Sequence, residues 1–215
     1  MNAGRAPQDM RLVAVMVSYN RLEQLKVSLA RLLQSAPAHL EAVVVIDNAS
    51  TDGTEAWLAT QSDPRLWVFR SATNGGGAGG FEQGMRHAVD RYDPDWLVVM
   101  DDDARPEPGA LGVFQSRVQS GDLDGVDAVS AAVYHPDGRI CDMNRPWVNP
   151  FWHKDAFKRT VKKGREGFHM GQKDYDCETP QRIDGGSFVG LFASRRGLQI
   201  GGFPGPSLFI YGDDD

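Results

Sequence analysis

Three consecutive aspartates, Asp101 to Asp103, directly follow the apolar run from Trp96 to Met100. Such a run is typical of a buried strand that delivers charge to the edge of a sheet. Adjacent carboxylates repel one another, and a hard divalent cation with oxygen ligands relieves this repulsion. In an extended segment, Asp101 and Asp103 would face one side and Asp102 the other. The residue types therefore indicate a candidate metal site, with a solvated acidic turn as the alternative.

Polar residues also follow the other predicted strands. We expect strands at residues 12–17, 42–46, 66–70 and 96–100, with helices between them from about 22, at 54–61 and at 79–92. This alternation predicts an α/β fold with a mostly parallel central sheet flanked by helices. Ligands bind at the carboxyl ends of strands in such sheets, so the polar segments should share one crevice. These segments are Ser18–Asn20, Asp47–Asp52, Asn74–Gly80 and Asp101–Asp103.

Local patterns predict further elements. Asn20 precedes the first helix and Glu23 follows three residues later, which is the spacing of a capping box. Beyond residue 106 we expect a helix at about 107–120, a strand at 127–134 and a turn at 135–138.

The segment 141–181 loses clear periodicity and has an uneven charge. Between His153 and Lys173, seven Lys or Arg residues face only Asp155 and Glu166. Aromatic residues accompany them at Trp147, Phe151, Trp152, Phe157 and Phe168. Two interpretations stay open: a mobile loop that contacts an anionic acceptor or a membrane surface, and an irregular segment packed by its aromatic residues.

The composition excludes several classes of protein. A formal charge of −6 over 215 residues disfavours a nucleic-acid-binding protein. Cys141 and Cys177 lack the spacing of a disulfide framework or a zinc site, which favours a reducing cytoplasm. The first ten residues lack the apolar core of a signal peptide, and no stretch reaches the roughly 20 apolar residues of a membrane helix. We expect a cytoplasmic protein that is soluble or, at most, attached to the inner face of the membrane.

The glycine-rich segment Asn74–Gly80 allows two interpretations. Gly75, Gly77 and Gly80 form a GxGxxG pattern between a strand and a helix, as in dinucleotide-binding sites. However, four to five residues separate the strand from Gly75, and three carboxylates beside a pyrophosphate are unfavourable without a metal. The glycines can instead let backbone amides approach a phosphate or a sugar closely. The second interpretation is favoured, and a dinucleotide-dependent oxidoreductase is the weaker alternative.

An ordered series of motifs resembles the family 2 glycosyltransferases of GT-A fold, whose sheet is Rossmann-like. The motifs are Val15–Arg21, Ile46–Thr54, Asn74–Gly80, Met100–Asp103, Asp184–Gly190 and Leu208–Asp214. The glycine segment and the Asp-Asp-Asp-Ala sequence resemble especially the branch with bacterial galactofuranosyltransferases and rhamnosyltransferases. Each motif alone is modest, and it is their order and spacing that make the likeness specific.

The resemblance implies a nucleotide-sugar site. Its residues would be Ser18, Tyr19, Asn20, Asp47, Asn74, Gly75, Gly76, Asp101 and Asp102. Tyr19 would lie against the nucleobase, and Asp47 would accept a hydrogen bond from its ring nitrogen. The glycine segment would line the donor sugar and phosphates, and Asp102 would support the ribose or the loop.

The resemblance also implies a division of the chemistry between two acidic clusters. Asp101 and Asp103 would be the DxD pair that holds Mn²⁺ or Mg²⁺ on the donor diphosphate. Asp214 would be the general base, with Asp213 as the close alternative. By itself, the run Asp213–Asp215 is more typical of an acidic tail.

The implied protein is a metal-dependent inverting hexosyltransferase of cell-surface polysaccharide synthesis. It would move a sugar from a UDP-galactofuranose or TDP-rhamnose type of donor to a saccharide or lipid-linked glycan. Residues 11–215 would form one GT-A domain, with a nucleotide-sugar-binding half at 11–134 and an acceptor-side half at 135–215. Relatives continue further, so we expect a truncated domain that binds nucleotide and metal but transfers weakly or not at all. A non-catalytic nucleotide-sugar-binding module is the main alternative.

Overall fold

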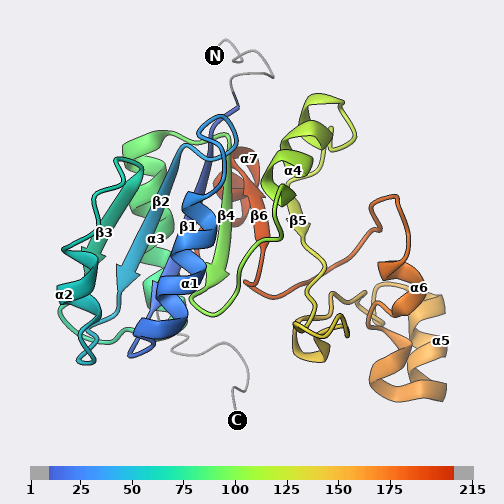
Figure 1. The fold of residues 1–215 in the computed structure, drawn as a ribbon. Helices are drawn as coiled ribbons and strands as arrows, with labels where there is room; N and C mark the ends of the chain where they lie inside the picture. Colours follow the sequence, from blue (N-terminus) through green and yellow to red (C-terminus); the bar gives the residue numbers. More distant parts are fainter. Residues whose placement is uncertain (1–9, 206–215) are drawn as a thin grey trace. The chain divides into compact units, whose positions relative to one another are not determined.

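The computed structural model describes residues 10–205, which include a six-stranded sheet with the order β3-β2-β1-β4-β6-β5 (Figure 1). The chain divides into two compact units. The sheet unit consists of the described residues up to 129 and from 192, and the insert unit is residues 130–191. Residue 134, the predicted boundary between the two halves, lies within the insert unit.

The centre of the sheet is parallel, as predicted. β1 (Leu12–Ser18) pairs with β2 (Ala42–Asp47) on one side and with β4 (Trp96–Asp101) on the other. β3 (Leu66–Arg70) continues the parallel pairing beyond β2. Every residue of β1 and β2 is buried, because both faces of these strands are covered. This burial explains why the strands are continuous apolar runs rather than alternating ones.

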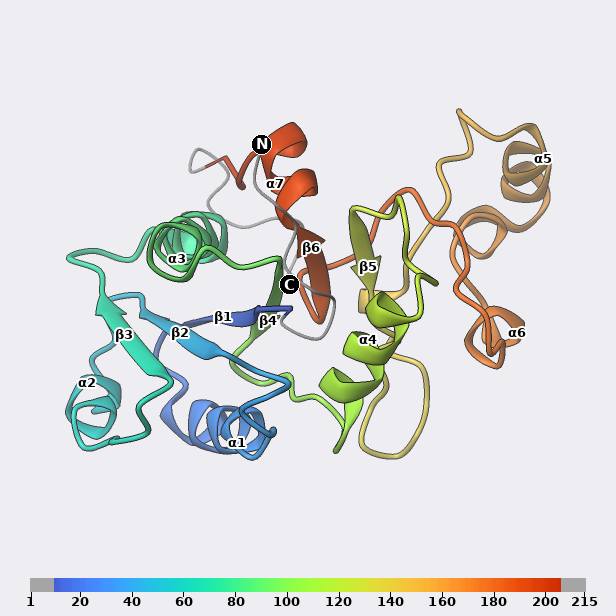
Figure 2. The same ribbon diagram turned by 90° about the horizontal axis from the view of Figure 1, so that it is seen from above.

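Helices cover both faces of the parallel strands (Figure 2). α1 (Leu22–Leu33) and α2 (Thr54–Leu58) lie on one face, and α3 (Gly76–Tyr92) lies on the other. The leucines at helical spacing in α1, which are Leu25, Leu29 and Leu32, are buried as the periodicity predicts.

The remainder of the sheet unit lies beyond β4. It contains α4 (Ala110–Gln119), β6 (Leu191–Ser194), α7 (Arg195–Gly201) and the start of β5 (Ala128–Ser130). Phe114 of α4 stacks on Phe192 of β6, with ring centroids 3.9 Å apart. The predicted strand at 127–134 was too long, since β5 ends at Ser130.

The insert unit contains short helices. They are η2 (Asp142–Asn144), α5 (Lys154–Lys163), η3 (Gly164–Gly167) and α6 (Gln172–Tyr175). The predicted turn at 135–138 is confirmed by an antiparallel bridge between Tyr134 and Ile140. We predicted no helix within 141–181, whereas four helical segments lie there. The two interpretations of this segment stay open. No helix within residues 10–205 is long and apolar enough to cross a membrane.

The start of α1 differs from the prediction. Asn20 does not cap the helix, which has Arg21 at the N-cap position without a side-chain cap. Asp52 accepts a hydrogen bond from the Leu22 backbone N–H at 2.9 Å instead. The predicted capping box was therefore wrong, because a carboxylate 30 residues away accepts the hydrogen bond from the first backbone N–H of the helix.

Glycines let α3 approach β1 closely. A Cβ atom on Gly80 would lie 2.6 Å from Cγ1 of Val17, and one on Gly84 would lie 2.5 Å from Cγ1 of Val15. Both distances are well below van der Waals contact, so a larger residue would push the helix away from the sheet. Part of the glycine pattern therefore serves helix-to-sheet packing rather than ligand binding.

We predict that Gly84→Ala lowers the free energy of unfolding by about 1–3 kcal/mol, because its methyl group would overpack the contact with Val15. Gly77→Ala is the matched control in the same helix, since a Cβ there meets nothing within 4 Å. It should raise stability by about 0.5–1 kcal/mol. Urea unfolding followed by circular dichroism measures both changes, and equal effects of the two variants would contradict the packing argument.

Candidate active site

The loops that follow β1 and β2 are joined by hydrogen bonds. The Asn20 backbone N–H donates to Oγ of Ser50 at 3.0 Å, and the Thr51 backbone N–H donates to Oδ1 of Asn20 at 2.7 Å. Asn20 has a φ of 54°, a left-handed conformation that asparagine tolerates better than most residues. Its side chain therefore organises the loops rather than the helix that follows.

The side chain of Asn48 joins the β2 loop to the glycine segment. Its Nδ2 donates to Oδ1 of Asn74 at 2.8 Å and to the Gly76 carbonyl at 2.9 Å. Its Oδ1 accepts from the Gly75 backbone N–H at 3.1 Å. These bonds hold the start of α3 at Gly76, earlier than the predicted start near Gly79. Gly77, Gly79 and Gly80 are thus helical and not a loop, whereas Gly76, where α3 begins, has a φ of 70°, a conformation that favours glycine.

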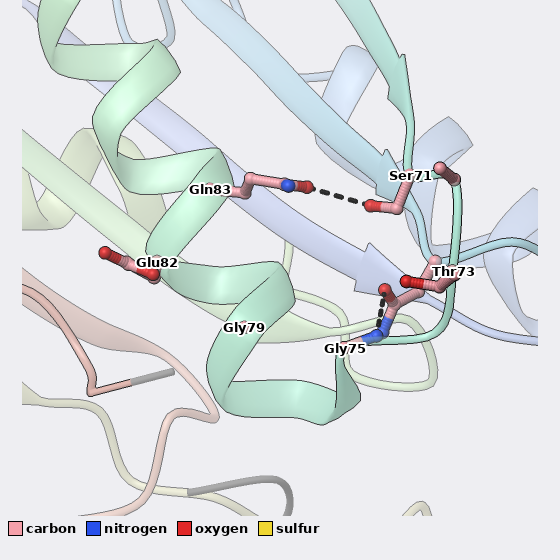
Figure 3. Close-up of a pocket in the computed structure, with 8 residues that line it drawn as sticks. Ser71, Thr73, Gly75, Gly79, Glu82 and Gln83 are labelled. Carbon is pink, nitrogen blue, oxygen red and sulfur yellow. Dashed lines mark hydrogen bonds between the residues drawn. The ribbon is translucent and has the colours of Figure 1, made fainter. Parts of the chain in front are cut away.

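A polar cavity of about 310 Å³ lies beside this junction (Figure 3). Its walls come from the segment after β3 and from the first turns of α3. The lining residues are Asn48, Ser71, Ala72, Thr73, Gly75, Gly79, Glu82 and Gln83. The Ser71 hydroxyl donates to Oε1 of Gln83 at 2.8 Å across the cavity wall. Hydroxyl, amide and carboxylate groups in one hollow suit a ligand rich in hydroxyl groups.

Asp47 is at the end of β2, as predicted, but its carboxylate is buried. Oδ2 accepts from Nη1 of Arg70 at 2.7 Å, and Oδ1 accepts from the Ser50 backbone N–H at 2.9 Å. Nη1 of Arg70 also lies 3.0 Å from a carboxylate oxygen of Glu55. A direct hydrogen bond from a nucleobase N–H to Asp47 would therefore require the Arg70 side chain to move.

Arg70 is a residue that our sequence reasoning missed. It is the last residue of β3, and its side chain is 37% exposed above the buried Asp47. A charged residue that ends an apolar strand was the available signal, and it is the same signal that identified the aspartates. Guanidinium donors at this position could meet the carbonyl oxygens of a base.

The three aspartates at the end of β4 have different surroundings. Asp101 ends the strand and is half-buried, Asp102 is buried, and Asp103 is exposed. The strand alternation that we predicted does not extend to Asp102 and Asp103, which lie in a turn. Nη1 of Arg21 lies 2.8 Å from Oδ2 of Asp103, and this ion pair connects the ends of β1 and β4.

Burial raises the pKa of Asp102 to about 6, because the charged carboxylate loses its hydration. The Ser18 hydroxyl and the positive charge of Arg21 act in the opposite direction but only partly compensate. The negative charge of Asp103 adds to the increase in pKa. Its burial thus distinguishes Asp102 from the half-buried Asp101 and the exposed Asp103.

The donor set at this edge fits a metal that is shared with a substrate. Within residues 10–205, no group of three or more His, Cys, Asp or Glu side chains could hold a metal ion by itself. Mg²⁺ and similar ions bind through one or two carboxylates together with substrate phosphates and water. Asp101 and Asp103 supply two carboxylates, so they fit an ion that arrives with a diphosphate.

The structure thus brings most of the predicted residues to one edge of the sheet. The strand register places Ser18 opposite Asp47 and Val17 opposite Asp101. Tyr19 follows directly and is 45% exposed, so its ring is accessible to a base. Asp213 and Asp214, the predicted bases, lie outside the described residues.

Comparisons with known proteins identify the family. The family model "Glycosyl transferase family 2" matches residues 13–174. The chain belongs to this family. Its α/β sheet, with helices on both faces, is accordingly a GT-A type of fold, as the sequence predicts.

Two curated glycosyltransferases are similar to part of this chain. The undecaprenyl-phosphate mannosyltransferase of Micrococcus luteus is 35% identical over 117 residues, which are 53% of this chain and 46% of the relative. The galactofuranosyltransferase GlfT1 of Mycolicibacterium smegmatis is 37% identical over 95 residues, which are 43% and 30% of the two chains. The matched regions thus cover less than half the length of each relative.

Solved structures of glycosyltransferases are also similar. One is the mannosyltransferase PcManGT of Pyrobaculum calidifontis in complex with GDP-Man and Mn²⁺, with 26% identity and a TM-score of 0.48. The match covers 63% of this chain and 39% of that one. Another is S. aureus TarS 1-349 in complex with UDP-GlcNAc, with 18% identity and a TM-score of 0.48 over 69% of this chain and 43% of that one.

We predict that ionisation of Asp102 opposes folding. Its pKa is about 6 in the folded protein against an ordinary value of 3.8, so the folded state binds the proton more tightly. The destabilisation is absent below about pH 4 and complete above about pH 6. Asp102→Asn has no carboxyl group to ionise and so lacks this destabilisation. Its free energy of unfolding, relative to that of the wild type, should therefore rise by up to about 3 kcal/mol between pH 4 and pH 7.

Urea unfolding in the presence of a chelator at several pH values measures this difference. Asp90→Asn, at an exposed position on α3, is the control and should stay parallel to the wild type. If the free energy of unfolding of Asp102→Asn also changed with pH in parallel with the wild type, the buried carboxyl group would not be the source of the pH dependence.

Proposed function

We propose that this chain is the donor-binding part of a metal-dependent inverting hexosyltransferase. The observation that carries the proposal is the convergence of Asp101, Asp103, the Asp47–Arg70 pair and the glycine start of α3 at one edge of the sheet. Membership of family 2 supports it. Because the chain spans less than half of its curated relatives, activity is proposed for the whole protein.

The nucleobase would lie near Tyr19 and the Asp47–Arg70 pair. The exposed Tyr19 ring offers a stacking surface, and Arg70 offers donors to base carbonyl groups. If the guanidinium moves aside, Asp47 becomes an acceptor for a ring N–H. Uracil and thymine carry both a ring N–H and carbonyl oxygens, which agrees with a UDP or TDP donor.

The donor diphosphate would lie between the aspartates and the start of α3. Asp101 and Asp103 would hold Mn²⁺ or Mg²⁺, which when bound stabilises negative charge on the leaving diphosphate. The ion pair between Arg21 and Asp103 is about half exposed on both sides, and such pairs contribute at most about 1 kcal/mol. The ion could therefore compete with Arg21 for Asp103, while Nη1 of Arg21 also lies 3.7 Å from Oδ1 of the buried Asp102. The polar cavity beside Asn48 is a candidate site for hydroxyl groups of the donor.

Inversion requires two groups on opposite sides of the anomeric carbon. An acceptor hydroxyl forms the new bond to that carbon while the bond to the diphosphate oxygen breaks on the other side. Asp214, or Asp213 as the close alternative, would accept the hydroxyl proton as general base. Asp101 and Asp103 are committed to the leaving group, so a different carboxylate is needed for the proton.

The acceptor is proposed as a saccharide or a lipid-linked glycan. One relative is named for transfer to undecaprenyl phosphate and the other for galactofuranosyl transfer. The role proposed for the whole protein is cell-surface polysaccharide synthesis at the cytoplasmic side of the membrane. A UDP-galactofuranose or TDP-rhamnose type of donor is the finer proposal.

Calorimetric titration with UDP, TDP and NAD, each with and without Mn²⁺, tests the proposal. We expect binding of UDP or TDP that depends on the metal. Metal-independent binding of NAD would instead support the dinucleotide oxidoreductase. Metal-dependent binding without sugar transfer by the full-length protein would support the non-catalytic binding module.

We predict that Asp103→Ala abolishes the metal-dependent part of UDP or TDP binding, because one of two metal carboxylates is lost. Asp122→Ala is the matched control, since Asp122 also forms an exposed ion pair with an arginine, at 2.9 Å from Arg117.

In the full-length protein, Asp214→Asn should keep donor binding and lower transfer by about 10²- to 10⁴-fold. Retained turnover would exclude Asp214 as the base.

A further inference from the structure

The insert unit carries a basic segment within an acidic chain. Residues 151–165 contain six Lys or Arg residues and one acidic residue, whereas the whole chain has a formal charge of −6. Most of this segment is helix α5. The positive charge is therefore concentrated on one short element.

The same segment exposes large apolar side chains. Phe151 is 85% exposed, Trp152 71%, Val161 72% and Phe157 48%. The rings of Phe151 and Phe157 lie 6.5 Å apart between centroids, so the apolar groups adjoin one another. Exposure of several large apolar side chains on one short segment marks an interaction surface.

Helical spacing places the apolar and basic side chains in adjacent stripes. Phe157 and Val161 are four residues apart and share a face of α5. Lys154, Lys158 and Lys162 repeat at the same spacing and form the neighbouring stripe. We call these five residues, with Phe151 and Trp152, the α5 surface.

The opposite face of α5 is fixed to the rest of the insert unit. Ala156 is buried, and Gly167 of η3 lies so close to the helix that a Cβ atom added there would clash with the backbone of Arg159 and Thr160. The guanidinium of Arg159 donates to the Gly167 carbonyl at 3.1 Å. The helix is thus held by one side, and the α5 surface is left exposed.

The nearby carboxylates neutralise little of the lysine charge. Asp155 lies 4.0 Å from Nζ of Lys158, and Glu166 is bound by Arg145 at 2.8 Å. Within residues 10–205, no ion pair involves Lys154 or Lys162. The charge is available to an external partner.

We propose that the α5 surface binds peripherally to a bilayer that contains anionic phospholipid. Aromatic and aliphatic side chains would enter the interface between headgroups and acyl chains, and the lysines would meet the lipid phosphates. A second copy of the chain fits less well, because a symmetric contact would place lysines against lysines. This surface is independent of the donor site, so the proposal does not rest on the proposed activity.

Cosedimentation of the 215-residue chain with vesicles tests the proposal. We expect binding to vesicles of phosphatidylglycerol and phosphatidylcholine, much weaker binding to phosphatidylcholine alone, and a decrease at high salt. Lys158→Gln and Lys162→Gln should each reduce the partition constant about fivefold. Lys173→Gln, an exposed lysine of the same unit outside the surface, should leave it unchanged.

The apolar contribution is tested separately. Trp152→Ser and Phe157→Ser should weaken binding, whereas Ile200→Ser, which alters an equally exposed apolar residue on α7, should not. Tryptophan fluorescence should shift to the blue on binding, and Trp152→Phe should remove this shift. Circular dichroism confirms that each variant is folded.

Three results would overturn the proposal. The first is no binding of the folded protein to anionic vesicles at low salt. The second is an equal loss of binding in Lys173→Gln, which would indicate general charge attraction. The third is a concentration-dependent dimer that Phe157→Ser dissociates, which would assign the α5 surface to a second copy of the chain.

Discussion

The parallel pairing of β1 with β2 and β4 is the constraint on which the site depends. The side chains of these strands are buried on both faces, so a one-residue slip would exchange tightly packed faces and is strongly disfavoured. The same register places Ser18 opposite Asp47 and Val17 opposite Asp101. Packing far from any ligand therefore determines which polar groups meet at the edge of the sheet.

Negative charge is concentrated at that edge, and two arginines form ion pairs with it in different surroundings. Arg70 is paired with a buried carboxylate, and breaking such a pair is costly because the charge left behind is desolvated. Arg21 is paired with the exposed Asp103, where water and ions compete easily. The Asp47 carboxylate can therefore release Arg70 only when another donor takes its place, while the Asp103 end can exchange its partner for a metal. Asp102, the buried residue between Asp101 and Asp103, destabilises the fold least when its carboxyl group is protonated.

The two units are stabilised by different kinds of interaction. The sheet unit is organised by buried apolar strands, and its loops are fixed by side chains such as Asn20 and Asn48 that reach across strand ends. The insert unit has few buried apolar residues and depends more on ion pairs and close backbone contacts, such as Arg145 with Glu166 and Gly167 with α5. A unit of this kind can expose aromatic and basic side chains without loss of its core.

The sequence by itself determined the parallel strands and the order of the strand-end motifs. The bounds of β3 were predicted correctly, and those of β1, β2 and β4 to within one residue, because strands buried on both faces must be continuous apolar runs. Only the tertiary structure decided the pairing of Arg70 with Asp47, the capping of α1 by Asp52 and the helical start of α3. Each of these depends on contacts between residues at least 20 positions apart, which no local pattern records. Helix α5 was missed because most of its residues are charged or polar and only Ala156 is buried, although its few apolar residues do recur at helical spacing.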